Sequence, residues 1–230
     1  MKAYDKTVSH LIEIRDINKT YQSGDTHVDA IKKMNFYIDD QEFVTIMGQS
    51  GSGKSTLLSI IGALNRPTKG SVLVDSLDLY ALTAEQRADF RSEYIGFIFQ
   101  SFQLIPYLTV LENVKLPMAV TGIKKKIKNE MAMDVIEHVG LKGKADRLPD
   151  QLSGGEQERV AIARAIVNKP PIILADEPTG NLDSTTAGEI MKLLQSLNKE
   201  GHTVIVVTHN PDMEAYASRT IRVADGRLAA

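Results

Sequence analysis

The chain has 230 residues, of which 43% are hydrophobic, and this is enough to bury the core of one large α/β domain. Its 27 Lys and Arg residues nearly balance its 29 Asp and Glu residues, and the net charge of −2 argues against a broad nucleic-acid-binding surface. The absence of cysteine excludes disulfides and thiolate chemistry and is compatible with a cytoplasmic protein.

The first part of the chain, from about Leu11 to Val44, alternates in places between apolar and polar residues, as at Met34, Phe36 and Ile38. Alternation of this kind is typical of strands that bury one face. We therefore predict a β-rich front section.

A glycine-rich loop follows, between a predicted buried strand at Phe43–Met47 and a predicted helix at Lys54–Ala63. It matches the pattern G-x-x-x-x-G-K-[ST] without a gap. Glycines let successive N–H groups point inward around an anion, and the N-terminus of the helix adds partial positive charge. We expect nine residues of this loop to contact a nucleotide: Gly48, Gln49, Ser50, Gly51, Ser52, Gly53, Lys54, Ser55 and Thr56.

Within this loop, Lys54 is placed to reach the β- and γ-phosphates and Ser55 to ligate Mg²⁺. A glycine turn that binds nothing is the alternative, but a chance match in a chain of this size is on the order of 1%. The loop predicts nucleoside triphosphate binding and leaves kinases, GTPases and recombinases open.

Another apolar run, Ile95–Phe99, is followed by Gln100. Taken alone, this glutamine is typical of an ordinary loop. The next segment, from about residue 102 to 150, carries no strand pattern. We predict that it is a mostly helical insert, with helices at 108–116 and 127–139 joined by a charged turn at 124–128. The lysines of that turn are typical of a solvated face, although such a run can also bind anionic lipid.

A second glycine turn, Leu152-Ser153-Gly154-Gly155-Glu156, opens a predicted helix in which Val160, Ala163 and Val167 recur at helical spacing. Its N–H groups, its serine hydroxyl and the helix N-terminus make another anion site. Taken alone, this turn is better interpreted as an ordinary serine-capped helix.

The segment Ile172–Glu177 is an apolar strand that ends in two carboxylates. Strands of a parallel sheet are buried on both faces, and ligands bind beyond their carboxyl ends. Asp176 would then hold Mg²⁺ through water, and Glu177 would orient and deprotonate an attacking water. An acidic cap of a helix or turn is the alternative, but beside a phosphate loop the catalytic interpretation is favoured.

One more strand of the same type, Thr203–His209, ends in a histidine. A single histidine at a strand end is more often a surface or capping residue. Because the other two strands end at the same edge of a parallel sheet, we expect the His209 side chain to reach the same crevice.

The ordered set of motifs resembles the nucleotide-binding subunit of an ABC transporter over nearly the whole chain. Tyr21 matches the aromatic residue that stacks on adenine, and Gln100 matches the loop glutamine that contacts Mg²⁺ and the attacking water. The turn at 152–156 matches the family signature, Asp183 matches the D-loop, and His209 matches the switch histidine.

Three stretches resemble the macrolide-exporter and lipoprotein-releasing branch of that family: Phe99–Pro106, Thr109–Asn113 and Asp176–Asp183. The chain departs from the usual pattern in two places. Gln49 stands where many members carry proline, and Glu156 stands where this branch often has glutamine. Neither departure removes a phosphate-cradling glycine, so we expect altered kinetics and retained activity.

The resemblance implies a homodimer that forms head to tail on binding ATP and Mg²⁺, with the turn at 153–155 closing over the γ-phosphate held by a second subunit. It also implies that Glu177 is the base, that His209 holds the γ-phosphate and the water, and that Lys54 stabilises the transferring charge. Metal ligands would come from three residues: Ser55, Gln100 and Asp176.

The resemblance further implies a membrane permease as partner, received by Gln100 and by the apolar patch Leu104–Tyr107, whose alternative is ordinary packing of the insert. No apolar run approaches the roughly 20 residues of a membrane span, and the polar start Met1–Asp5 is unlike a signal peptide. We expect a protein on the cytoplasmic face of the membrane, attached through its permease, and no nucleic-acid partner.

The predicted fold class is α/β, with a P-loop NTPase core around a parallel sheet, an antiparallel β front section and a helical insert. We expect residues 1–230 to form a single ABC nucleotide-binding domain, in which about 102–150 and the signature helix form a helical subdomain. Two other functions stay open: an ABC ATPase that regulates cell-envelope enzymes without moving a solute, and a soluble ABC ATPase that acts on DNA or ribosomes.

Overall fold

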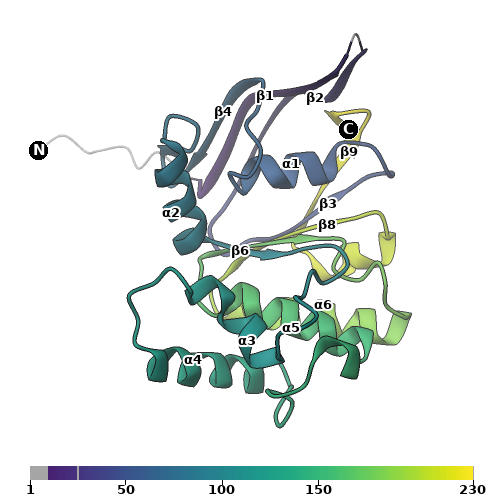
Figure 1. Ribbon diagram of the computed structural model, residues 1–230. Helices are drawn as coiled ribbons and strands as arrows, with labels where there is room; N and C mark the ends of the chain where they lie inside the picture. Colours follow the sequence, from purple (N-terminus) through teal and green to yellow (C-terminus); the bar gives the residue numbers. More distant parts are fainter. Residues whose placement is uncertain (1–9, 25, 230) are drawn as a thin grey trace, which may run out of the picture.

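A computed structural model describes residues 10–24 and 26–229. The polar start Met1–Asp5 lies outside the described residues. Two sheets enclose one helix, and further helices cover the outer face of the second sheet (Figure 1). The elements therefore stack in layers, and each layer of side chains between them is apolar.

The front section is an antiparallel sheet with the strand order β2-β1-β4-β5. It confirms the predicted β-rich region, in which Met34 and Ile38 are buried. The sequence pattern did not indicate the two later strands of this sheet. Its strands are β1 (Ile12–Ser23), β2 (Thr26–Ile38), β4 (Lys69–Val74) and β5 (Leu77–Asp78).

The second sheet has the order β10-β9-β3-β8-β7-β6, and all of its pairings are parallel except that of β9 with β10. The four predicted apolar strands are adjacent in it, which confirms the parallel core. The strands are β3 (Phe43–Met47), β6 (Ile95–Ile98), β7 (Ile172–Asp176), β8 (Thr203–Thr208), β9 (Arg219–Ala224) and β10 (Arg227–Leu228).

The helix α1 (Lys54–Ile61) lies between the two sheets (Figure 1) and buries Leu57, Leu58, Ile60 and Ile61. It ends two residues before the predicted boundary, because Gly62 follows as its C-cap. An additional helix, α2 (Ala84–Tyr94), leads into β6 and begins with a capping box at Thr83.

Four helices cover the other face of the second sheet (Figure 1). These are α3 (Val110–Lys115), α4 (Lys125–His138), α5 (Gly154–Ile166) and α6 (Ser184–Lys199). Short 3-10 turns occur at Leu116–Met118, Pro149–Gln151 and Pro211–Tyr216.

One sequence-based boundary in the insert was wrong. The lysine-rich segment 124–128 is not a turn between helices, since α4 already begins at Lys125. The Lys128 ammonium donates hydrogen bonds to the carbonyl oxygens of Met118 and Thr121, so this lysine anchors the start of the helix to the preceding loop. Charge alone had suggested a loop, whereas the local hydrogen bonds support a helix.

Candidate functional site

The phosphate loop connects β3 to α1 and depends on its glycines. Gly51 and Gly53 have φ angles of 78° and 101°, in the left-handed region that favours glycine. A Cβ on Gly53 would also lie 2.3 Å from the Ala30 carbonyl oxygen, and one on Gly48 would lie 2.2 Å from that of Val223. The loop conformation that turns N–H groups toward an anion is therefore closed to other residues at these positions.

Lys54, the first residue of α1, is buried beneath this loop. Its ammonium donates a 2.8 Å hydrogen bond to the Gln49 carbonyl oxygen, so the side chain folds back across the loop. The positive charge of Lys54 and the N-terminus of α1 thus act on the same small volume, which suits a polyphosphate.

Two of the predicted metal ligands are in direct contact. The Ser55 hydroxyl donates a 2.9 Å hydrogen bond to Oδ1 of Asp176, at the end of β7. Burial raises the pKa of Asp176, while the Ser55 hydrogen bond acts in the opposite direction. A hydroxyl beside a half-buried carboxylate is an oxygen donor set that suits Mg²⁺, which prefers one or two carboxylates and keeps several waters.

Glu177 and His209 form a second pair. His209 Nδ1 lies 2.8 Å from Oε1 and 2.9 Å from Oε2 of Glu177. The two residues follow the neighbouring parallel strands β7 and β8, and the Glu177 N–H donates to the Val207 carbonyl oxygen. Sheet pairing thus brings together a carboxylate and an imidazole that lie far apart in the sequence.

Lys54, Ser55, Glu177 and His209 line one pocket of about 310 Å³, and nine of its ten lining residues were predicted from the sequence. Ala30 also lines it. This residue carried no signal in the sequence, and it belongs to the pocket because its carbonyl abuts Gly53. The lining residues are Ala30, Ser50, Gly51, Gly53, Lys54, Ser55, Thr56, Gln100, Glu177 and His209.

Three other predicted residues of the loop, Gly48, Gln49 and Ser52, face the opposite side. There they line a hollow against the end of β9 and the turn that follows it. These three residues thus line the surface of the loop that faces β9, and they do not line the nucleotide pocket.

Tyr21 and the residues of the signature and D-loop lie outside the nucleotide pocket. The Tyr21 hydroxyl accepts a 2.5 Å hydrogen bond from Nδ2 of Asn65, and the residue is 41% exposed. Asp183 caps α6 by accepting from the N–H groups of Thr185 and Thr186. The hydroxyl of Thr186 also donates to Asp183 and holds the pKa of that carboxyl low.

The signature turn caps α5 in the same chain. Ser153 and Glu156 form a reciprocal capping box, in which each side chain accepts from the other's backbone N–H. Glu156 also contacts the Lys144 ammonium, and this contact is the main cause of its lowered pKa. The departure at Glu156 therefore keeps the cap and adds an ion pair with Lys144.

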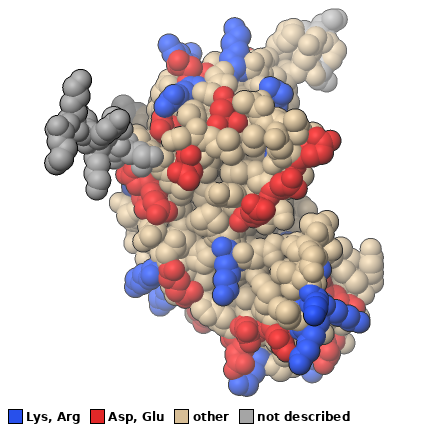
Figure 2. All heavy atoms as spheres, turned by 90° about the vertical axis from the view of Figure 1, so that its left-hand side faces the viewer, with Lys and Arg blue, Asp and Glu red and all other residues tan. Residues whose placement is uncertain are grey.

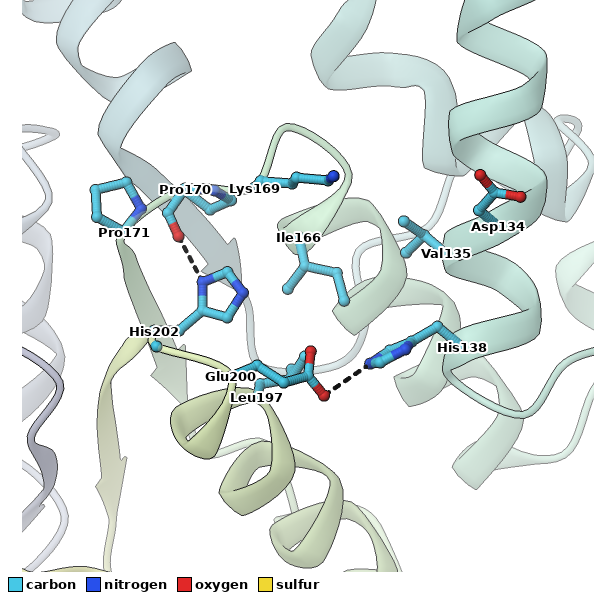
Figure 3. A pocket seen from close by; sticks show the side chains of 11 residues that line it. Asp134, Val135, His138, Ile166, Lys169, Pro170, Pro171, Leu197, Glu200 and His202 are labelled. Atoms are coloured by element: carbon cyan, nitrogen blue, oxygen red, sulfur yellow. Dashed lines mark hydrogen bonds and ion pairs between the residues drawn. The ribbon is translucent and has the colours of Figure 1, made fainter.

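A larger cavity, of about 560 Å³, lies at the opposite ends of the strands, next to the residues that precede β7 and β8 (Figure 3). His202 Nδ1 lies 2.6 Å from the Pro170 carbonyl oxygen, and His138 Nε2 lies 3.3 Å from Oε1 of Glu200. The described residues hold no cluster of three or more metal-ligating side chains here or elsewhere. None of the predicted site residues lines this cavity.

A third hollow, of about 440 Å³, lies between β6, the end of α2 and the 3-10 turn after α3. Its lining includes Phe97, Phe99 and the highly exposed Val120. On the face that Figure 2 shows, which includes α2, acidic and basic side chains alternate with uncharged areas, and no extended basic patch forms. Apolar side chains make up most of the lining of this groove, and Arg91 and Arg164 also contribute to it.

A phosphate loop with a carboxylate and an imidazole at the ends of adjacent parallel strands defines a P-loop nucleoside triphosphatase. The family model described as ABC transporter matches residues 31–180, and the chain belongs to this family. It is an ATP-binding cassette ATPase, homologous to the ATP-binding components of the macrolide and lipoprotein systems.

The relatives agree along most of the chain. The lipoprotein-releasing system ATP-binding protein LolD of Geobacter metallireducens is 45% identical over 224 residues, which cover 97% of this chain and all of that protein. The macrolide export ATP-binding/permease protein MacB of Chlorobium phaeobacteroides is 47% identical over 95% of this chain. The match covers only 33% of MacB itself.

Among solved structures, the dimeric ABC transporter cassette MJ0796 has a TM-score of 0.88 and 45% identity, covering 95% of this chain and 97% of that one. A post-hydrolysis dimer of the same cassette, bound to ADP and Pi, also has a TM-score of 0.88, at 44% identity and with the same coverage. These matches confirm the predicted fold class and the predicted ATPase class.

Proposed function

We propose that this chain is the ATP-hydrolysing subunit of a transporter of the macrolide and lipoprotein export type, and that it works as a head-to-tail dimer beneath a separate membrane permease. The observation that carries the catalytic part is the Glu177–His209 pair at the mouth of the phosphate loop. A carboxylate there can accept a proton from water, and an imidazole beside it can bridge that carboxylate to the γ-phosphate.

In this mechanism the oxygen of a water attacks the γ-phosphorus of ATP, and the bond from that phosphorus to the β–γ bridging oxygen breaks, releasing ADP and phosphate. Glu177 accepts the proton of the attacking water. Lys54 and the loop N–H groups stabilise the charge on the β- and γ-phosphate oxygens, and His209 donates to the γ-phosphate. The burial of Lys54 strengthens its electrostatic effect.

Mg²⁺ would be held by Ser55, Asp176 and Gln100, with remaining positions taken by water and phosphate oxygens. When bound, it neutralises charge on the phosphates during transfer. The contact between Ser55 and Asp176 supports this assignment, since two oxygen ligands from different elements already lie together. The position of Gln100 in the lining of the same pocket also supports it.

The dimer part of the proposal rests on the signature turn at 153–155. Its residues do not line the pocket of their own chain, although they combine a helix N-terminus with exposed N–H groups. Similarity to a cassette solved as a dimer supports the same arrangement here. Each pocket would then take its second anion cradle from the partner subunit. Tyr21 would stack on the adenine, and Asp183 would lie near the dimer interface.

The permease part rests on the apolar groove beside β6 and on the neighbouring patch Leu104–Tyr107, in which the Tyr107 side chain is 78% exposed. No helix among residues 10–24 and 26–229 is long and apolar enough to cross a membrane. We propose that a cytoplasmic segment of the permease docks on this side, beside Gln100, and holds the dimer at the cytoplasmic face.

Replacement of Glu177 by Gln tests the catalytic assignment. We expect Glu177→Gln to lower kcat for ATP hydrolysis by about a thousandfold, because the general base is removed, and to keep ATP binding intact. Size-exclusion chromatography with ATP and Mg²⁺ should then show a stable dimer. Glu93→Gln, an exposed change on α2, serves as the control. Hydrolysis by Glu177→Gln at the wild-type rate would refute the assignment.

The same variant tests the partner. Tagged Glu177→Gln protein should retain a membrane permease when it is isolated with ATP from detergent-solubilised native membranes and analysed by mass spectrometry. Recovery of envelope-enzyme regulators together with the permease would favour the regulatory alternative. Recovery of ribosomes or DNA-associated proteins alone would overturn the transporter assignment.

A further inference from the structure

The segment that follows Gln100 has an unusual backbone. Ser101, Phe102 and Gln103 have φ angles of 61°, 61° and 49°, three successive non-glycine residues in the left-handed region. Side chains with a Cβ rarely adopt this region singly, and a run of three needs contacts that hold it. The backbone therefore indicates a segment that its surroundings constrain.

Arg164, near the end of α5, supplies the main contacts. Its Nη1 donates a 2.6 Å hydrogen bond to the Gln103 carbonyl oxygen, and its Nη2 donates a 2.8 Å bond to that of Phe102. One planar guanidinium thus holds two successive carbonyl groups. Asn181, between β7 and α6, adds a 3.3 Å bond from its Nδ2 to Oγ of Ser101.

The opposite end of α5 touches the same segment. A Cβ on Gly154 would lie 3.8 Å from the ring of Phe102, so the aromatic side chain packs beside the signature turn. The segment 101–103 is therefore held from both ends of the signature helix.

The constrained segment lies between two functional regions. Gln100 precedes it and lines the nucleotide pocket. Leu104–Tyr107 follows it, and the Ile105 N–H donates a 2.8 Å hydrogen bond to Oδ1 of the buried Asn113. Any change in the backbone at 101–103 would redirect the side chain of Gln100.

We propose that Arg164 is a positioning residue for ATP hydrolysis, because its guanidinium holds segment 101–103 in the left-handed conformation and so sets where the amide of Gln100 lies. This inference rests on the proposed role of Gln100 as a ligand of Mg²⁺ in the nucleotide pocket. Arg164 itself touches neither the nucleotide pocket nor the reacting atoms. It acts through the backbone that carries Gln100.

A purely structural role for Arg164 makes different predictions. If Arg164 only anchored α5, its loss would lower stability and affect ATP binding and turnover together. A positioning role separates these readouts, since the phosphate loop binds ATP without segment 101–103. Loss of the clamp should then reduce kcat and leave the dissociation constant for nucleotide nearly unchanged.

The first test compares Arg164→Met with Arg159→Met in the full chain. Arg159 is a matched control, because it lies on the same helix and its guanidinium also donates to a backbone carbonyl, that of Val139, at 3.0 Å. We expect Arg164→Met to lower kcat by about tenfold or more, with the dissociation constant of a fluorescent ATP analogue changed by less than about threefold. Arg159→Met should keep kcat within about twofold. A wild-type kcat for Arg164→Met would overturn the proposal.

The second test is rescue by glycine, which adopts positive φ without strain. In the Arg164→Met background, Gln103→Gly should restore kcat severalfold, whereas Gln103→Ala should not. If Arg164→Met does not fold, as judged by thermal unfolding, the same Gly and Ala pair is made in Arg164→Lys, which keeps one donor. Equal kcat for the Gly and Ala variants would refute positioning through the backbone.

The two proposals can fail separately. If the wild-type chain hydrolyses no ATP, the proposed function fails. If the wild-type chain hydrolyses ATP, Glu177→Gln does not, and Arg164→Met equals the wild type, only the positioning role fails.

Discussion

Two hydrogen bonds organise the chemistry at the scale of single residues. Ser55 contacts Asp176, and His209 contacts Glu177, and in both cases the partners come from different elements. The sequence predicts each of these residues separately, because each lies next to an apolar strand or a glycine loop. It does not predict the contacts, which depend on β7 lying next to β8 and on α1 beginning beside both.

The buried Glu158 gives a prediction about pH. This side chain is 1% exposed, and its Oε1 accepts no hydrogen bond from the residues that the structure describes. Burial raises its pKa to about 8, against a positive charge on Arg164 that acts to lower it. Between the ordinary carboxyl pKa of 4.5 and about 8, the folded protein keeps a proton that the unfolded chain releases.

The contribution of Glu158 to stability is therefore greatest below about pH 4.5 and falls as the pH rises to about 8. The amide that Glu158→Gln introduces does not titrate, so this variant lacks the pH-dependent contribution. We expect its free energy of unfolding, relative to the wild type, to rise by a few kcal/mol between about pH 5 and pH 8. Urea unfolding at several pH values measures this. A difference that stays flat over this range, as expected for the exposed control Glu93→Gln, would contradict it.

At the scale of elements, the packing of α5 against α6 leaves no room at one glycine of the signature turn. A Cβ on Gly155 would lie 2.4 Å from Cγ2 of Thr186, whereas the nearest atom to a Cβ on Gly154 lies at 3.4 Å. Thr186 cannot easily move aside, because its hydroxyl donates a 2.6 Å hydrogen bond to Asp183. The close approach of these two helices thus depends on the absence of a side chain.

We expect Gly155→Ala to lower the free energy of unfolding by about 1–3 kcal/mol through overpacking. Gly154→Ala is the matched control and should cost less. Thr186→Ser removes Cγ2 and keeps the hydroxyl, so the double variant Gly155→Ala, Thr186→Ser should recover stability. Denaturation midpoints with urea measure all four variants. A double variant no more stable than Gly155→Ala would exclude this contact as the cause.

The elements differ in how well the sequence predicts them. Strands β3, β6, β7 and β8 were predicted because each is an apolar run, followed by the glycine loop at β3 and by a polar residue at the other three. Strands β4 and β9 were not predicted, because each is partly exposed and its sequence holds no continuous apolar run. The helix α6 was also missed, although its apolar residues at 190, 194 and 197 recur at helical spacing.

The sequence also does not indicate the contact of Arg164 with segment 101–103. The sequence Ser-Phe-Gln at 101–103 contains no glycine or asparagine, so nothing in it indicates a left-handed backbone. The conformation arises only from contacts with α5, which is about sixty residues away along the chain. Motifs read locally cannot show such a contact.

At the scale of the whole molecule, the head-to-tail dimer predicts complementation between two defective chains. Lys54→Ala removes the phosphate-binding lysine, and Ser153→Arg blocks the signature turn. In a mixed dimer, both defects fall in one composite site and the other site stays intact. If each site were built from one chain, neither site of the mixed dimer would be active.

Each variant alone should therefore be inactive, and an equal mixture should regain activity. Random assortment gives half of the dimers as mixed, each with one of two sites intact, so we expect about a quarter of the wild-type kcat. Phosphate release measured after mixing and re-equilibration checks this. A mixture as inactive as its components would rule out composite sites.

The order of the second sheet has a consequence for communication within the molecule. The strands that lead to the phosphate loop, Glu177 and His209 each have a neighbour on both sides, whereas in the described part of the chain β6 pairs with β7 alone. Gln100 lies two residues after the end of β6. Gln100 is thus the one of these groups that follows an edge strand, and its position depends on segment 101–103 and not on strands at both sides. A partner bound at this edge, as proposed for the permease, would shift Gln100 while the interior strands keep Lys54, Glu177 and His209 in place.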